Sequence, residues 1–187
     1  CFYQAPVEND DDEKLRNTTF AGEEKINSNT LIDTHGAYVV APRNVARRLN
    51  VSFVDATKIT HDIETELGIE GSRKLHMWFR PGECPQIPKG RQDNTHYNVY
   101  GARLVANALA DEIGKQVPEL KKHVRHYDYV VSTRGRGNYF TLQDAVDAVP
   151  AGKRVKVLVL DGSWKKPENM KGKKIKFILQ FGAKITD

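Results

Sequence analysis

Hydrophobic and polar positions alternate in blocks along the first 120 or so residues, and the blocks predict strands and helices in turn. Short apolar runs at residues 2–7 and 51–57 are typical of buried strands. Apolar residues at helical spacing predict helices over residues 38–50 and 58–75, and Gly68 is a plausible stop signal in the second. Strands that alternate with helices indicate an α/β layered fold.

A polar stretch at residues 77–97 follows these elements. It contains three prolines and two glycines, so we expect a long loop, and long loops inside compact domains are usually functional or mobile. An amphipathic helix comes next and ends before Pro118. Its apolar face consists of Tyr100, Leu104, Val105, Ala108, Leu109 and Ile113.

The pattern changes near residue 125, where we place a domain boundary. A Gly-rich turn leads to a short helix with Thr141 as the candidate N-cap and Asp144 three residues later. An apolar strand at residues 155–160 is followed, about 19 residues after its start, by a second at 174–185. Strands at such an interval are similar to those of a β-solenoid.

Composition fits an ordinary soluble protein of 187 residues, with 39% apolar and 28% charged residues. The net charge of +5 comes mainly from Lys/Arg clusters after residue 114. These clusters form either a solvated face or a surface for an acidic polymer. No nucleic-acid-binding motif accompanies them, so no nucleic-acid partner is expected.

Other classes of protein are not indicated. No apolar run is long enough to span a membrane. The two cysteines, Cys1 and Cys84, have no paired spacing, so we expect neither a metal site nor a disulfide framework. No cofactor is expected.

Asp93 and His96 are the candidate catalytic residues, because an acid and an imidazole stand three residues apart directly before the amphipathic helix. A hydroxyl nucleophile needs a base to take its proton, and the base needs an acceptor on its other ring nitrogen. His96 would be the base and Asp93 the acceptor. The same spacing also arises when an acid merely begins a helix beside an exposed histidine. Spacing alone leaves both interpretations open.

A longer stretch around this pair resembles the SGNH (GDSL-like) hydrolases. Residues 93–109, DNTHYNVYGARLVANAL, are similar to the last sequence block of that family. The segments DTHGAY and MWFRPGECPQIPKGRQDNTH extend the resemblance, over about residues 30–115, to its rhamnogalacturonan acetylesterase branch. The resemblance implies a flavodoxin-like three-layer α/β/α fold and a serine esterase that removes acetyl groups from pectic polysaccharide. In it, His96 would be the general base and Asp93 its partner.

The chain departs from that family's pattern at the nucleophile and the oxyanion hole. It has no Gly-Asp-Ser segment, and in VEND the residue Val7 stands where the family has Gly. Ser28, Ser52 and Ser72 lie in no comparable turn. We therefore expect the C-terminal half of an esterase domain, inactive by itself, with further material upstream of Cys1.

Residues 127–185 resemble the opening of a pectin methylesterase through YDYVVSTRGRGNYFTLQDAVDAVPAGKRVKVLVLDGSW. This resemblance implies the first turns of a right-handed parallel β-helix. We expect two domains, an esterase half at 1–125 and a β-helix start at 126–187. That family's catalytic residues lie farther along than Asp187, so none is assigned here. Lys165 and Lys166 stand where the family usually has an acid.

Three further residues are candidates for substrate binding: Trp78, His35 and Asn94. Trp78 would stack on a sugar ring or belong to the core. His35 would face the substrate or hydrogen-bond within its own loop.

The resulting prediction is a fragment of a pectin-degrading carbohydrate esterase that acts on pectic polysaccharide. The resemblance implies a secreted, periplasmic or cell-surface location. The incomplete solenoid end could pair with a second copy of the chain. The alternative is a non-catalytic module that binds acidic polysaccharide. A third interpretation has the chain completing a site with a partner that carries the serine.

Overall fold

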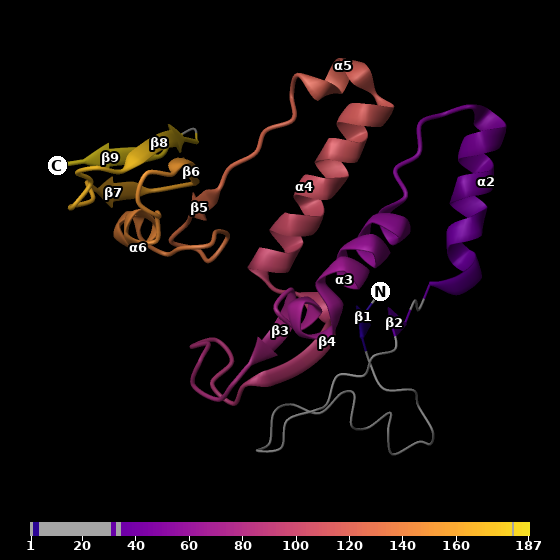
Figure 1. Ribbon diagram of the computed structural model, residues 1–187, viewed down its shortest axis with the longest axis horizontal. Helices are drawn as coiled ribbons and strands as arrows, with labels where there is room; N and C mark the ends of the chain where they lie inside the picture. Colours follow the sequence, from indigo (N-terminus) through magenta and orange to yellow (C-terminus); the bar gives the residue numbers. More distant parts are fainter. Residues whose placement is uncertain (1, 4–30, 33–34, 181) are drawn as a thin grey trace. The chain divides into compact units, whose positions relative to one another are not determined.

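A computed structural model describes residues 2–3, 31–32, 35–180 and 182–187, which form a mixed α/β protein. The chain divides into two compact units, Cys1–Val124 and Arg125–Asp187 (Figure 1). Much of the predicted first strand, the acidic segment after it, and Asp33 and Thr34 lie outside the described residues.

The first unit combines helices with two antiparallel strand pairs, β1 with β2 and β3 with β4. Helices α3 and α4 contact each other, and they contact β3 and β4 respectively. In chain order the elements are β1 (Phe2–Tyr3), β2 (Leu31–Ile32), the 3-10 helix η1 (Gly36–Val39), α2 (Val40–Leu49), α3 (Ala56–Arg73), β3 (His76–Phe79), β4 (Arg91–Tyr97), α4 (Val99–Gln116) and α5 (Pro118–Lys121).

The helices agree with the sequence pattern, but the strand predicted at 51–57 is wrong. Val51 is 57% exposed, and residues 51–55 are irregular. The reason is that Asp55 acts as the N-cap of α3 and accepts a hydrogen bond from the backbone N–H of Lys58 at 3.1 Å. Gly68 interrupts α3 with φ 64° and ψ −172°, yet the helix continues to Arg73.

The loop predicted at 77–97 is also partly wrong, because its two ends pair as the hairpin β3–β4. Only residues 80–90 connect the strands. β4 has the sequence RQDNTHY, which lacks apolar alternation. Its pairing therefore rests on backbone hydrogen bonds to the apolar strand HMWF, and periodicity does not reveal it.

The second unit is built on parallel strands around a valine-rich core. β5, β6 and β8 form one sheet, and β7 pairs with β9. Thr141 caps α6 by accepting from the N–H of Asp144 at 3.0 Å, as its sequence indicates. The elements are β5 (Tyr129–Val131), α6 (Leu142–Asp147), β6 (Arg154–Val159), β7 (Ser163–Lys165), β8 (Lys174–Leu179) and β9 (Lys184–Thr186).

The two units bury different kinds of residue. In the second unit, one core cluster joins α6 to the inner faces of the strands. In the first, the described residues bury Leu75 and Val105 together with polar side chains. Those buried polar side chains are Glu64, Ser72, His76 and Gln92. The predicted apolar face of α4 is only partly buried, since Tyr100 is 51% and Ile113 38% exposed.

Candidate active site

A bulge in the β3–β4 hairpin carries Asp93 and His96. Asp93 pairs with Met77, and Tyr97 pairs with His76. Two adjacent residues of β3 are thus paired with two residues of β4 that are four positions apart. The intervening residues, Asn94 to His96, therefore leave the regular ladder. Bulges of this kind redirect side chains and are common beside active sites.

The bulge brings the imidazole of His96 onto the carboxylate of Asp93. His96 Nδ1 lies 2.8 Å from Asp93 Oδ2. The side chain of Asp93 is 11% exposed, whereas that of His96 is 69% exposed. The pair is thus a largely covered acid that holds an exposed imidazole.

Asp93 also accepts hydrogen bonds from the neighbouring residues of the bulge. Its Oδ1 accepts hydrogen bonds from the backbone N–H of His96 at 2.9 Å and of Thr95 at 2.9 Å. The Thr95 hydroxyl donates to the same oxygen at 2.8 Å, and Arg91 lies 3.1 Å from Oδ2. Burial alone would raise the pKa of Asp93, but the backbone donors of His96 and Thr95, the Thr95 hydroxyl and the His96 ring outweigh it and lower the pKa to about 2.

This environment fixes the tautomer of His96. An ionised carboxylate can only accept, so Nδ1 must carry the hydrogen that it shares with Asp93. In the neutral ring the lone pair is then on Nε2, at the exposed side of the residue. An imidazole in this state can take a proton from a hydroxyl group, and Asp93 would stabilise the imidazolium that forms.

Asn98 and Gly101 anchor the helix that follows the pair. Asn98 Oδ1 accepts from the N–H of Gly101 at 2.9 Å and so caps α4. Its Nδ2 donates to the carbonyl groups of Lys74 and His76, both at 2.8 Å. A Cβ at position 101 would lie 2.2 Å from the carbonyl oxygen of Leu75, so only glycine allows this approach. Asn98 therefore ties the start of α4 to β3.

A buried polar layer lies beneath the hairpin. The ring of His76 stacks on that of Tyr97, with centroids 4.8 Å apart and an interplanar angle of 18°. His76 Nδ1 donates to the carbonyl of Ser72 at 3.1 Å, and its Nε2 lies 3.5 Å from Glu64 Oε1. The Ser72 hydroxyl donates to Glu64 Oε2. Because Tyr97 directly follows His96, this layer supports the end of the bulge.

Burial favours the neutral forms of both Glu64 and His76. Burial raises the pKa of Glu64 against the opposing effect of its Ser72 hydrogen bond. Burial likewise lowers the pKa of His76 to about 4, against the effect of the Ser72 carbonyl. Burial, with the nearby Glu64 carboxylate, raises the pKa of Tyr97 to about 12. A neutral His76 with its hydrogen on Nδ1 has a lone pair on Nε2, the nitrogen that lies 3.5 Å from Glu64 Oε1.

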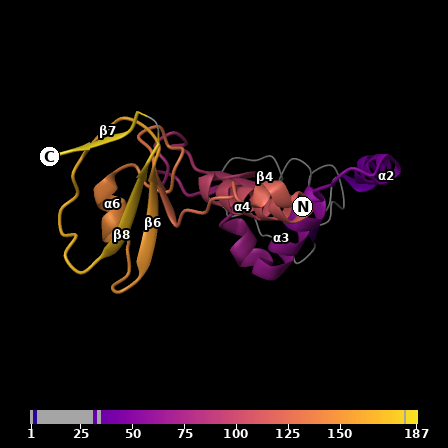
Figure 2. The ribbon, with the colours of Figure 1, turned by 90° about the horizontal axis from the view of Figure 1, so that it is seen from above.

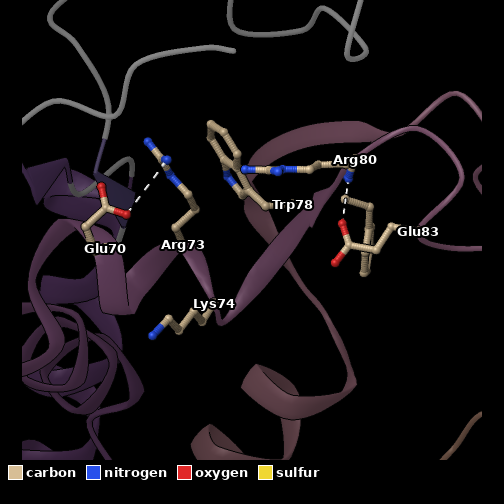
Figure 3. Close-up of a pocket in the computed structure, with 7 residues that line it drawn as sticks. Glu70, Arg73, Lys74, Trp78, Arg80 and Glu83 are labelled. Atoms are coloured by element: carbon tan, nitrogen blue, oxygen red, sulfur yellow. Dashed lines mark hydrogen bonds and ion pairs between the residues drawn. The ribbon is translucent and has the colours of Figure 1, made fainter.

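A pocket of about 290 Å³ lies beside the hairpin (Figure 3). It is lined by Glu70, Arg73, Lys74, Trp78, Phe79, Arg80 and Glu83. The guanidinium of Arg73 lies 4.3 Å from the ring centroid of Trp78, and Figure 3 shows Arg80 directed toward Trp78 from the other side. Trp78 Nε1 donates to Asn94 Oδ1 at 2.6 Å, so this wall of the pocket is joined to the bulge.

The structure brings together four of the five candidate residues, since Trp78 and Asn94 join the Asp93–His96 bulge. His35 belongs to another element: it is exposed and precedes η1. Neither Ser52 nor Ser72 joins this group of residues. The Ser52 hydroxyl donates to the carbonyl of Gln116, and the Ser72 hydroxyl donates to the carboxyl group of Glu64.

Sequence reasoning missed Thr95, Asn98 and the Glu64–His76 pair. Asn98 could have been found as an N-cap residue directly before an apolar helical pattern. The buried pair had no local signal, because Glu64 and His76 look like surface residues of a helix and a strand. In the described ranges, no three His, Cys, Asp or Glu side chains gather as a metal site would require, and no helix there has the length and apolar character to cross a membrane.

The chain contains a portion similar to SGNH-type carbohydrate esterases. It is 36% identical, over 91 residues, to rhamnogalacturonan acetylesterase RhgT of Bacillus subtilis (strain 168), a match that covers 49% of this chain and 39% of the relative. The chain thus spans well under half of that relative's length. No family model matches the chain. No solved structure matches it either.

Proposed function

We propose that the first unit supplies the general base and its orienting acid to an esterase that removes acetyl groups from rhamnogalacturonan. The observation that carries the proposal is the 2.8 Å contact between Asp93 and His96 on the hairpin bulge. The partial identity to a rhamnogalacturonan acetylesterase supports it.

The proposed chemistry is acyl transfer through a serine. His96 Nε2 takes the proton of the serine hydroxyl as the oxygen attacks the acetyl carbonyl carbon. The proton then passes to the departing sugar oxygen, which leaves an acetyl-enzyme. Water, deprotonated by the same nitrogen, releases acetate and restores the serine. Asp93 stabilises the imidazolium in both halves of the reaction.

The serine and the oxyanion donors are the parts that this chain does not supply in recognisable form. No Gly-Asp-Ser segment occurs in its 187 residues. We therefore expect the chain to be inactive by itself and to work with residues outside it, in one polypeptide or in a partner.

Substrate binding is proposed for the pocket next to the bulge. Trp78 offers an aromatic surface of the kind that packs against sugar rings, and Asn94 lies between it and the catalytic pair. His35 remains a candidate on the strength of the family resemblance alone.

For the second unit we propose the start of a right-handed parallel β-helix, related to pectin methylesterases. Two parallel strand pairs support this: β6 and β8 are offset by 20 residues and β7 and β9 by 21, as in Arg154↔Lys174 and Ser163↔Lys184. Such a unit exposes strand edges and could associate with a second copy. A pectic substrate implies a secreted, periplasmic or cell-surface location.

A chimera tests the catalytic proposal. The 91 matching residues of the Bacillus subtilis relative are replaced by those of this chain, and acetate release from acetylated rhamnogalacturonan is measured. We expect an active chimera in which H96A lowers kcat by about 10⁶-fold and D93N by about 10⁴-fold. A folded, active chimera that keeps its rate with H96A would refute the assignment. The unmodified chain serves as the blank.

A further inference from the structure

Four cations stand in register on one face of the β5–β6–β8 sheet. Arg154 lies directly opposite Lys174, and Lys156 directly opposite Lys176. All four side chains are exposed. Figures 1 and 2 show β6 and β8 side by side. We call this group the cation ladder.

The alternation of the strands keeps the ladder on one face. Val155 and Val157 are fully buried on the opposite face, where Ile175 and Phe177 pack against the same core. Neighbouring strands are about 4.8 Å apart, and residues two apart on a strand are separated by roughly 6.6 Å. The ladder therefore concentrates its positive charge in a very small area.

No ion pair within the described residues neutralises the ladder. Other lysines of the same unit do have partners: Lys165 lies 3.7 Å from Glu168, and Lys166 lies 2.9 Å from Asp187. Asp128 directly precedes β5, and its carboxylate accepts from the backbone N–H of Lys156 at 2.8 Å.

Folding does not explain this arrangement. Like charges directly opposite each other across two strands are destabilising, and here two such pairs follow one another. The repulsion disappears when an anion with several charges lies across the ladder. Four cations spread over two neighbouring strands suit an extended polymer better than a small compact anion.

We infer that the cation ladder is a binding surface for the carboxylates of a polyuronate chain. The choice of a uronate polymer rests on the proposed function, whereas the positive surface itself does not. A single-stranded nucleic acid fits less well, because such ligands are usually held by aromatic side chains that stack on the bases. The next residues on this face are Leu158 and Ile178, which are aliphatic.

Binding of polygalacturonate to the whole chain tests the inference. Isothermal titration calorimetry compares polygalacturonate with neutral dextran of similar length at 50 and 300 mM NaCl. The key variant is K156Q/K176Q, which removes one opposing pair. The matched control is K165Q/K184Q, which removes two exposed lysines from the β7–β9 pair and lowers the net charge by the same amount.

We expect polygalacturonate to bind at low salt, dextran not to bind, and binding to weaken at high salt. The key variant should lose roughly twentyfold in affinity, at about fivefold for each basic side chain facing an anionic surface. The control should lose less than threefold. Equal losses in both variants would show a diffuse charge effect and overturn the inference.

A single-stranded oligonucleotide is tested in the same way. If it binds more tightly than polygalacturonate, and K156Q/K176Q weakens that binding, the choice of ligand is overturned. These measurements do not depend on ester hydrolysis. An active chimera that keeps its rate with H96A, together with intact ladder binding, would therefore refute the esterase proposal alone. A chimera that depends on His96, together with lost ladder binding, would refute the ladder alone.

Discussion

The indole of Trp78 is hydrogen-bonded to the side chain of Asn94, with 2.6 Å between Nε1 and Oδ1. This bond joins the pocket wall to the bulge that carries Asp93 and His96. The position of the candidate base is thus linked to the surface on which a sugar would lie.

A double-mutant cycle measures that link. W78F and N94A should each lower the free energy of unfolding by about 1 kcal/mol, the usual contribution of one hydrogen bond. The double variant should lose less than the sum, because both single changes remove the same bond. Urea unfolding followed by the helical circular dichroism signal measures the coupling, and strict additivity would contradict it.

Asp93 should make the stability of the first unit depend on acid pH. Its pKa is lowered from 3.8 to about 2 in the folded chain. Its ionisation therefore stabilises the fold above about pH 4, and the contribution is lost as the pH falls from about 4 to 2. D93N should cost about 2 kcal/mol at pH 6 and much less near pH 2. An equal cost at both pH values would contradict the lowered pKa.

Glu64 should have the opposite dependence. Burial raises its pKa, so the folded chain favours the protonated form and loses stability as the pH rises from 4.5 through the raised pKa. E64Q keeps a neutral side chain of the same shape and should be more stable than the wild type at pH 7, with the gain shrinking toward pH 4. His76 titrates in both proteins, so the difference between their urea curves reports Glu64. A loss of stability at pH 7 would indicate an ionised Glu64.

G101A should destabilise the first unit by about 2 kcal/mol or more, because the new methyl group would overlap the Leu75 carbonyl. Gly→Ala within a helix normally stabilises by about 0.5–1 kcal/mol, so a gain would refute the close contact. Thermal unfolding by circular dichroism distinguishes the two signs.

K176E should stabilise the second unit and weaken polyuronate binding together. A glutamate opposite Lys156 replaces a repulsive cross-strand pair by an attractive one, which contributes about 0.2–1 kcal/mol. Thermal unfolding in low salt should show a higher midpoint than the wild type, and the difference should fall at 1 M NaCl. The opposite change would indicate that Lys176 has a partner.

Local signals predicted α2, α3, α4 and α6, because the apolar residues of the longer helices recur at helical spacing and Thr141 directly precedes α6 as its cap. They did not reveal the caps Asp55 and Asn98. The Asp93–His96 contact followed from their spacing together with the family resemblance. Pairing between distant segments was not predictable in this way. The residues of the polar strand β4 do not alternate regularly, because a bulge interrupts the pairing. Glu64 and His76 come into contact only once α3 packs against β3.

The contact at Gly101 also offers a way to recognise comparable hairpins in other chains. Five positions after the histidine, a residue with any side chain would push helix α4 away from Leu75 and displace the neighbouring imidazole. A chain with the Asp-x-x-His spacing but a bulkier residue five positions after the histidine would therefore lack the close approach between helix and strand seen here. Glycine at that position distinguishes a sequence that can form this hairpin from one that only shares the spacing.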